Sequence, residues 1–209
     1  SPAPREVHIT QPLNDQHLPP KRNASRELVF PDFPAFRPNL TPEQVLQYGS
    51  FGGTYYRPIY SSVSGKRHSN EHKELPADWL KGLDIEKQIT SKVYNANENK
   101  YGVKCGGDLT MWESKGWISP LDVYGWFQWY CRFYRGRRTS DDNRQISRAL
   151  GVMGPKGRFR NQLINKCHQL GARYDDASVS PVIRQTLQHW GYELTEKDLQ
   201  QYIKKKKKS

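Results

Sequence analysis

Positive charge is concentrated in one stretch of the chain. Between Arg132 and Arg173 the sequence contains nine arginines and two lysines but only two acidic residues, Asp141 and Asp142. An arginine guanidinium can bind two phosphate oxygens at once, and aromatic rings can stack on nucleic-acid bases. An aromatic run, GWFQWYCRFY at residues 125–134, overlaps the start of this stretch. Arginines next to aromatics predict a polyanionic partner, DNA or RNA.

The basic stretch also suggests which side chains contact the nucleic acid. We expect them to project from helices and from the turns between helices. The predicted nucleic-acid-binding residues are Arg135, Arg137, Arg138, Arg144, Arg148, Lys156, Arg158, Arg160, Asn161 and Lys166. The alternative is a paired surface network, in which Asp141 and Asp142 bind Arg144 or Arg148.

A helix-turn-helix is one way to use these residues. Two expected helices, 140–150 and the one that starts at Pro155, flank the short turn Gly151–Gly154. A helix N-terminus offers free N–H donors to a phosphate. In helix-turn-helix geometry the second helix enters the major groove. The side chains that would then reach base edges are Arg158, Asn161, Gln162 and Asn165.

Signals for catalysis are weaker. His68 and His72 have the spacing of two metal ligands on one helix face, but Gly65 and Pro76 indicate a loop there. The sequence around Lys66 lacks the glycine and hydroxyl residues of a phosphate-binding loop. Cys105 precedes two glycines, which favours a structural thiol at a tight turn. We therefore predict no catalytic residue, no metal site and no cofactor.

The elements that position the basic residues are helices. Most of the expected helices have a start signal and a stop signal. Such a helix starts at a serine, threonine or aspartate that precedes proline or acidic residues, and it ends at a glycine one helix length later. The expected helices run from Thr41 to Gly49, Asp108 to Gly116, Ser119 to Gly136, Ser140 to Gly151, Pro155 to Gly171, Ser180 to Gly191 and from Thr195 into the lysines. Residues 51–60 and the following segments predict short strands and turns. The fold class is mainly α, a helical bundle in the second half with a small irregular or short-strand N-terminal part.

The helix within residues 119–136 has two apolar faces. Trp126, Trp129, Tyr130 and Phe133 follow helical spacing on one of them. A helix that is apolar on both sides is typical of a buried central helix. A stacking platform built from part of it is the alternative.

Composition divides the chain into three parts. Hydrophobic residues make up only 35% of the sequence although aromatic residues reach 12%, which predicts polar tails on a folded core. We expect a disordered proline-rich arm at 1–40, a single mostly helical domain at 41–203 and a lysine tail at 204–209. The tail contributes five of the twelve net positive charges and adds non-specific phosphate affinity.

Cysteine usage and hydropathy indicate the cellular compartment in which the protein is expected. Three widely spaced cysteines show no disulfide or zinc pattern, and no apolar stretch is long enough to cross a membrane. An intracellular protein without a membrane partner is expected, with the nucleus as a candidate location.

Four segments resemble an uncharacterised family of hypothetical proteins: FGGTYYRPIY (51–60), KYGVKCGGDLTMWES (100–114), GWFQWYCRFYRGRR (125–138) and SPVIRQTLQHWGYEL (180–194). The resemblance implies one continuous domain over about 51–194 and no activity. Function is therefore predicted from the residues as nucleic-acid binding. The alternatives are an enzyme acting on DNA or RNA with an aromatic base pocket and a structural component of a ribonucleoprotein.

Overall fold

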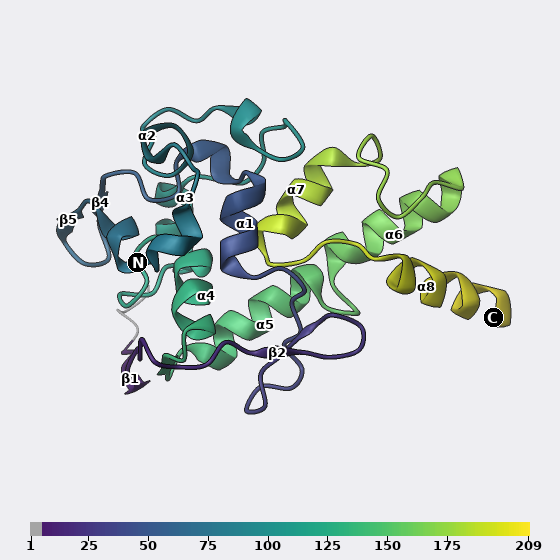
Figure 1. Ribbon diagram of the computed structural model, residues 1–209, viewed down its shortest axis with the longest axis horizontal. Helices are drawn as coiled ribbons and strands as arrows, with labels where there is room; N and C mark the ends of the chain where they lie inside the picture. The colour runs from purple at the N-terminus through teal and green to yellow at the C-terminus, as the bar shows by residue number, and fades with distance from the viewer. Residues whose placement is uncertain (1–5) are drawn as a thin grey trace.

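The protein is mainly α-helical, as predicted. The structure is a computed structural model that describes residues 6–209, of which 43% are helical and 8% are in strands. The α-helices are α1 (Pro42–Tyr48), α2 (Ile85–Gln88), α3 (Leu109–Ser114), α4 (Trp126–Tyr134), α5 (Asp142–Met153), α6 (Arg158–Leu170), α7 (Pro181–His189) and α8 (Glu196–Lys208). Figure 1 shows α6 and α8 extending away from the other helices, with the C-terminus at the far end of α8.

Helix α4 is the centre of the core. Trp129, Tyr130 and Phe133 are fully buried, which confirms the prediction of a buried aromatic helix. Its polar atoms are satisfied inside the protein: the indole N–H of Trp129 donates to Asp142, and the Tyr130 hydroxyl donates to the Leu40 carbonyl. The helix begins at Trp126, however, and the expected start at Ser119 was wrong. Residues 119–125 form turns that end at Gly125, whose φ of 106° is outside the helical region.

Residues 6–40 are folded onto the domain, which contradicts the expectation of a disordered arm for this part of the segment. Leu28, Phe30 and Phe36 are at most 3% exposed, and Phe36 packs its ring against Trp126, Trp129, Tyr130 and Phe133. The aromatic residues between the prolines therefore bury enough apolar surface to fix the segment. The first five residues of the predicted arm lie outside the described part.

Three short antiparallel pairs of strands complete the N-terminal half. Strand β1 (Ile9–Gln11) pairs with β6 (Arg138–Thr139), which ties the N-terminal segment to the end of α4. The others are the pair of β2 (Lys21–Arg22) with β3 (Leu28–Val29) and the pair of β4 (Ile59–Ser61) with β5 (Lys66–His68). Between them lie the 3-10 turns η1 (Phe51–Gly53), η2 (Glu71–Glu74), η3 (Ala77–Leu80) and η4 (Ala96–Glu98).

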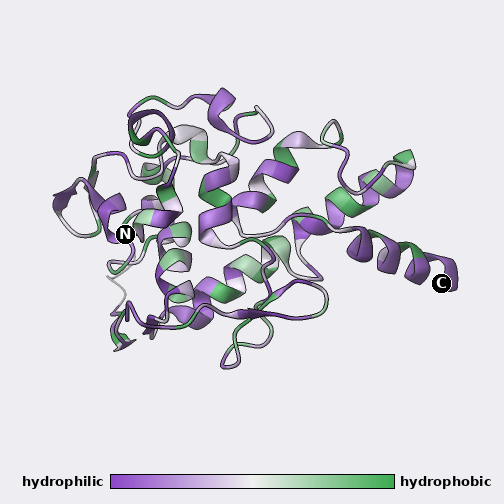
Figure 2. Cartoon of the chain, viewed as in Figure 1, coloured by the Kyte–Doolittle hydropathy of each residue, from purple (hydrophilic) through white to green (hydrophobic). Residues whose placement is uncertain are grey.

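Helices α5 and α6 carry five of the eleven cations of the basic stretch, and α8 carries the lysine tail. Helix α6 packs against both α5 and α8. The lysines of the predicted tail continue α8 as far as Lys208, and Figure 2 shows α8 as predominantly hydrophilic. Its apolar residues Leu199, Tyr202 and Ile203 contribute to the core or pack against it. No helix in the described part of the chain is long and apolar enough to cross a membrane.

Candidate nucleic-acid interface

Arg137 does not lie on the surface. The residue is 3% exposed, and its guanidinium makes two hydrogen bonds to the carboxylate of Asp122, which is 1% exposed. Arg132 donates to the same carboxylate and to Glu74. Arg137 therefore holds the turn before α4 against the strand after it. The structure thus places Arg137 in the interior and not on an accessible basic surface.

Arg135 and Arg138 are paired with acids from the N-terminal segment. Arg135 donates to Asp15 at 2.7 Å, and Arg138 donates to Asp32 at 2.8 Å. The guanidinium of Arg138 also lies 3.8 Å from the centroid of the Phe133 ring. The hydrogen bond from Arg138 lowers the pKa of Asp32. These two arginines bind the N-terminal segment. A paired network was considered from the sequence, but the acids that pair here are Asp15 and Asp32 and not Asp141 and Asp142.

Arg144 and Arg148 surround an exposed tryptophan. Arg144 forms an ion pair with Asp141 at 2.7 Å, as the paired alternative expected. Both arginines also donate to the backbone carbonyl of Trp117. They lie on α5 with partly exposed side chains, so they fix the loop that carries Trp117.

Lys156, Arg158 and Lys166 are the predicted residues that the structure leaves most accessible. All three are exposed, and none forms an ion pair with another described residue. Arg158 lies at the first turn of α6, where the helix N-terminus is electropositive. These residues together with Lys204–Lys208, which are also exposed, are called here the α6–α8 face.

The geometry of a helix-turn-helix is present only in part. Helices α5 and α6 pack together across the connection 154–157, but Asn161 turns inward and donates to the carbonyls of Pro155 and Gly157. Asn165 accepts a hydrogen bond from Tyr202 of α8. Two of the four side chains expected to reach base edges are therefore engaged within the protein.

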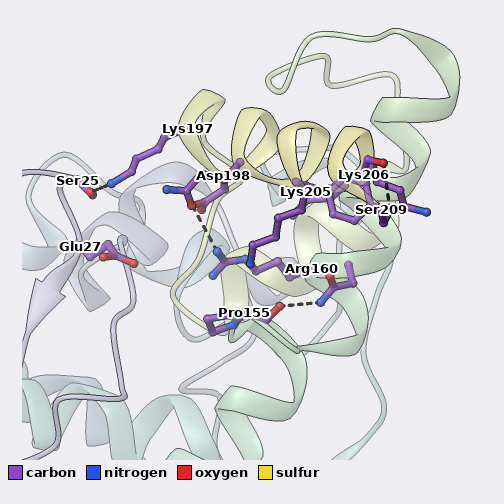
Figure 3. Close-up of a pocket in the computed structure, with 13 residues that line it drawn as sticks. Ser25, Glu27, Pro155, Arg160, Lys197, Asp198, Lys205, Lys206 and Ser209 are labelled. Atoms are coloured by element: carbon purple, nitrogen blue, oxygen red, sulfur yellow. Dashed lines mark hydrogen bonds and ion pairs between the residues drawn. The ribbon is translucent and has the colours of Figure 1, made fainter.

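A pocket lies between α6, α8 and the loop of residues 25–27. Its volume is about 510 Å³, and its lining includes the cations Arg160, Lys197, Lys205 and Lys206. Figure 3 shows Arg160 pointing toward Asp198, with which it forms an ion pair at 3.3 Å, while Lys205 and Lys206 come from the next turns of α8. Arg160 also donates to the Met153 carbonyl and lies over the Tyr192 ring. It fixes α8 on α6 and leaves the lysines as the accessible charges.

Ser64, His68 and Glu71 have the connectivity of a hydrolytic triad. The Ser64 hydroxyl lies 2.7 Å from His68 Nε2, and His68 Nδ1 lies 3.0 Å from Glu71. A nucleophilic serine also needs free N–H groups for the oxyanion. The amides of residues 64 and 65 donate instead to Ser61, and the amide of Lys66 donates to the Ser64 hydroxyl. The cluster therefore stabilises the turn between β4 and β5.

Cys105 and His189 also lie close together, with Sγ and Nδ1 3.6 Å apart. His189 Nε2 accepts the amide N–H of Phe51 at 3.0 Å, so the ring proton is on Nδ1 and points at the sulfur. A base for Cys105 would need a lone pair there. Burial lowers the pKa of His189 to about 3 and raises the pKa of Cys105. Neither group is prepared for nucleophilic catalysis.

The aromatic base pocket considered from the sequence is not formed by α4. The rings of α4 contact one another and Phe36 within the core, which leaves them unavailable to a flipped base. No group of three or more potential metal ligands is found among residues 6–209.

Sequence reasoning missed two features. The acids that bind Arg132, Arg135 and Arg138 lie 58, 120 and 106 residues away, so counting neighbouring acids could not find them. The second missed feature is Trp117, which is 37% exposed and not packed into the core. The glycine before it was the available signal, because Gly116 with a φ of 70° turns the chain away from α3.

No protein-family model matches the sequence, and neither a curated protein nor a solved structure is significantly similar to the chain.

Proposed function

We propose that the protein binds nucleic acid, DNA or RNA, through the α6–α8 face. The observation that carries the proposal is that the accessible cations of the basic stretch and of the lysine tail lie on or just before two adjacent helices, whereas most other arginines of the basic stretch are paired within the protein. Residues 154–170 contain four cations and no acid. Helix α8 adds five consecutive exposed lysines.

Asp198, which lines the pocket between α6 and α8, is already engaged within the protein. Asp198 is bound by Arg160 and by the hydroxyl of Tyr192. The run Lys204–Lys208 begins six residues after Asp198, more than one helical turn away. Their ammonium groups remain free to bind phosphates, which interact with lysine as a point charge.

A nucleic acid fits this face better than a lipid surface does. A helix that binds a membrane presents a free apolar face beside its lysines. The apolar side of α8 is already used, because Leu199 is 4% exposed and Tyr202 and Ile203 pack on the core. Phosphates that approach from solvent require no such face. A nuclear location, where both nucleic acids are abundant, is part of the same proposal.

The test is binding to duplex DNA, single-stranded DNA and RNA across a salt series. Each neutralised phosphate contributes about −0.9 to the log–log salt slope on duplex DNA, so four to six contacts give roughly −3.6 to −5.4. Replacing Lys204–Lys208 by glutamine should weaken binding and make this slope shallower. Arg158→Gln with Lys166→Gln should weaken it further.

A charge-matched control separates this face from net charge alone. Replacing five exposed cations elsewhere by glutamine should leave the salt slope nearly unchanged. The control positions are Lys66, Arg67, Lys73, Lys81 and Lys92. If both sets of substitutions reduce binding equally, net charge rather than this face attracts the ligand. If no polyanion binds, the proposal is wrong.

A further inference from the structure

Trp117 is held at the surface in a fixed position. Of the six tryptophans it is the most exposed, at 37%. Its backbone carbonyl accepts hydrogen bonds from Arg144 and Arg148, and its amide donates to the Trp112 carbonyl. An exposed indole whose backbone is hydrogen-bonded through both its carbonyl and its amide presents a flat apolar surface on which a planar group can be placed.

The surroundings of Trp117 are positively charged. Lys115 Nζ lies 4.9 Å from the ring centroid and the Arg148 guanidinium lies 5.7 Å from it. Arg148 lies 5.6 Å from the ring of Trp190 as well, so its guanidinium joins two partly accessible aromatics. An aromatic ring flanked by cations is the arrangement in which single-stranded nucleic acids stack a base and place the neighbouring phosphates.

Helix α5 contacts both this tryptophan and a residue that lines the pocket between α6 and α8. Arg148 contacts Trp117, and the carbonyl of Met153, five residues further along α5, accepts from Arg160 in the pocket lining. Helix α5 thus contacts both positive regions.

We infer that Trp117 is a stacking platform for an unpaired base, and that the ligand is therefore single-stranded nucleic acid. The inference rests on the proposed function and narrows it. In a duplex both faces of each base are stacked and unavailable to the indole. In a single strand one base stacks on Trp117, and Lys115 and Arg148 bind the adjoining phosphates.

The test compares two ligands and three variants. A short fluorescent oligothymidylate and a duplex of the same length are titrated with the wild type, Trp117→Ala, Trp117→Tyr and Tyr60→Ala. Tyr60 is the matched control because it is an aromatic residue, 59% exposed, on the separate hairpin of β4 and β5. Melting temperatures establish that each variant is folded.

Trp117→Ala removes one base–aromatic stack, so it should bind the single strand about 5- to 160-fold more weakly than the wild type. Trp117→Tyr should retain most of the affinity, and Tyr60→Ala should match the wild type. Affinity for the duplex and the salt slope should not change in any variant. This pattern supports the inference.

Two other results overturn it. If Trp117→Ala binds the single strand as the wild type does, or loses both ligands to the same extent, Trp117 is not a stacking platform. In either case the proposed function stands, because the wild type still binds. If the wild type binds neither ligand, the proposed function fails and the inference fails with it.

Discussion

The carboxylate of Asp122 receives both terminal nitrogens of the Arg137 guanidinium, at 2.8 and 2.7 Å, in a site almost closed to solvent. Arg132 adds a third hydrogen bond to this carboxylate, at 3.0 Å. The most arginine-rich turn of the sequence thus contains a buried ion pair that joins the start of α4 to β6.

Asp122→Ala should strongly destabilise the protein. The substitution leaves Arg137 buried without its counter-charge, and breaking a buried pair in this way costs about 3–5 kcal/mol. The free energy of unfolding from urea titration measures the loss. Asp175→Ala is the control, since Asp175 pairs with Arg173 at the surface and should change the midpoint little. Equal effects of the two substitutions would contradict the structural role of Asp122.

Phe36→Ala tests the position of the N-terminal segment. Phe36 is fully buried against the rings of α4, and truncation of a buried phenylalanine costs about 3–5 kcal/mol. Pro34→Ala, a substitution in the same segment without a buried ring, is the comparison. A variant at position 36 that unfolds at the wild-type denaturant concentration would show that residues 28–40 are not part of the core.

His189 should make stability depend on pH between about 6.5 and about 3. Burial lowers the pKa of His189 from 6.5 to about 3, so the unfolded chain binds a proton in this range and the folded chain does not. Stability from this group is complete above 6.5 and is lost as the pH falls, by at most about 1.4 kcal/mol per pH unit.

The measurement is the free energy of unfolding at several pH values for the wild type and His189→Gln. Glutamine can still accept the Phe51 amide hydrogen bond but does not titrate. The variant should be less sensitive to acid over this range. Parallel pH profiles would mean that His189 is accessible to protons in the folded protein.

Asn161→Ala should affect stability more than binding. Its side-chain amide closes the turn between α5 and α6 through two carbonyls, and the loss of hydrogen bonds of this kind costs about 1–2 kcal/mol. Gln162→Ala, at the neighbouring exposed position, should leave stability unchanged. Thermal melting and oligonucleotide titration separate the two effects. Weaker binding at unchanged stability would instead favour base readout by α6.

Local signals in the sequence predicted the helices of the second half well. Thr41 and Thr195 cap their helices as expected, because a capping side chain and the amide it accepts are three residues apart. Ser119 failed as a helix start since the chain turns until Gly125. The buried face of α4 was predictable for the same local reason, its helical spacing of aromatics.

The candidate site was less predictable because its charges are neutralised by distant residues. The sequence identified Lys156, Arg158 and Lys166 as nucleic-acid-binding residues, together with arginines that looked equally free of nearby acids. Only the fold separates them, by bringing Asp15, Asp32 and Asp122 to the arginines. Exposure of Trp117 is likewise a property of how the loop after α3 is anchored on α5.

The pairing of β1 with β6 has a consequence for how the chain acquires its structure. Residues 8–11 and 32 are synthesised first, but their partners near residues 138–140 follow more than 100 residues later. Contacts of such long sequence separation slow folding, because the intervening chain must be ordered before they form. During synthesis the N-terminal aromatic residues therefore remain exposed until α4 has left the ribosome. Arg135 and Arg138 are paired with Asp15 and Asp32 only after these distant segments have come together.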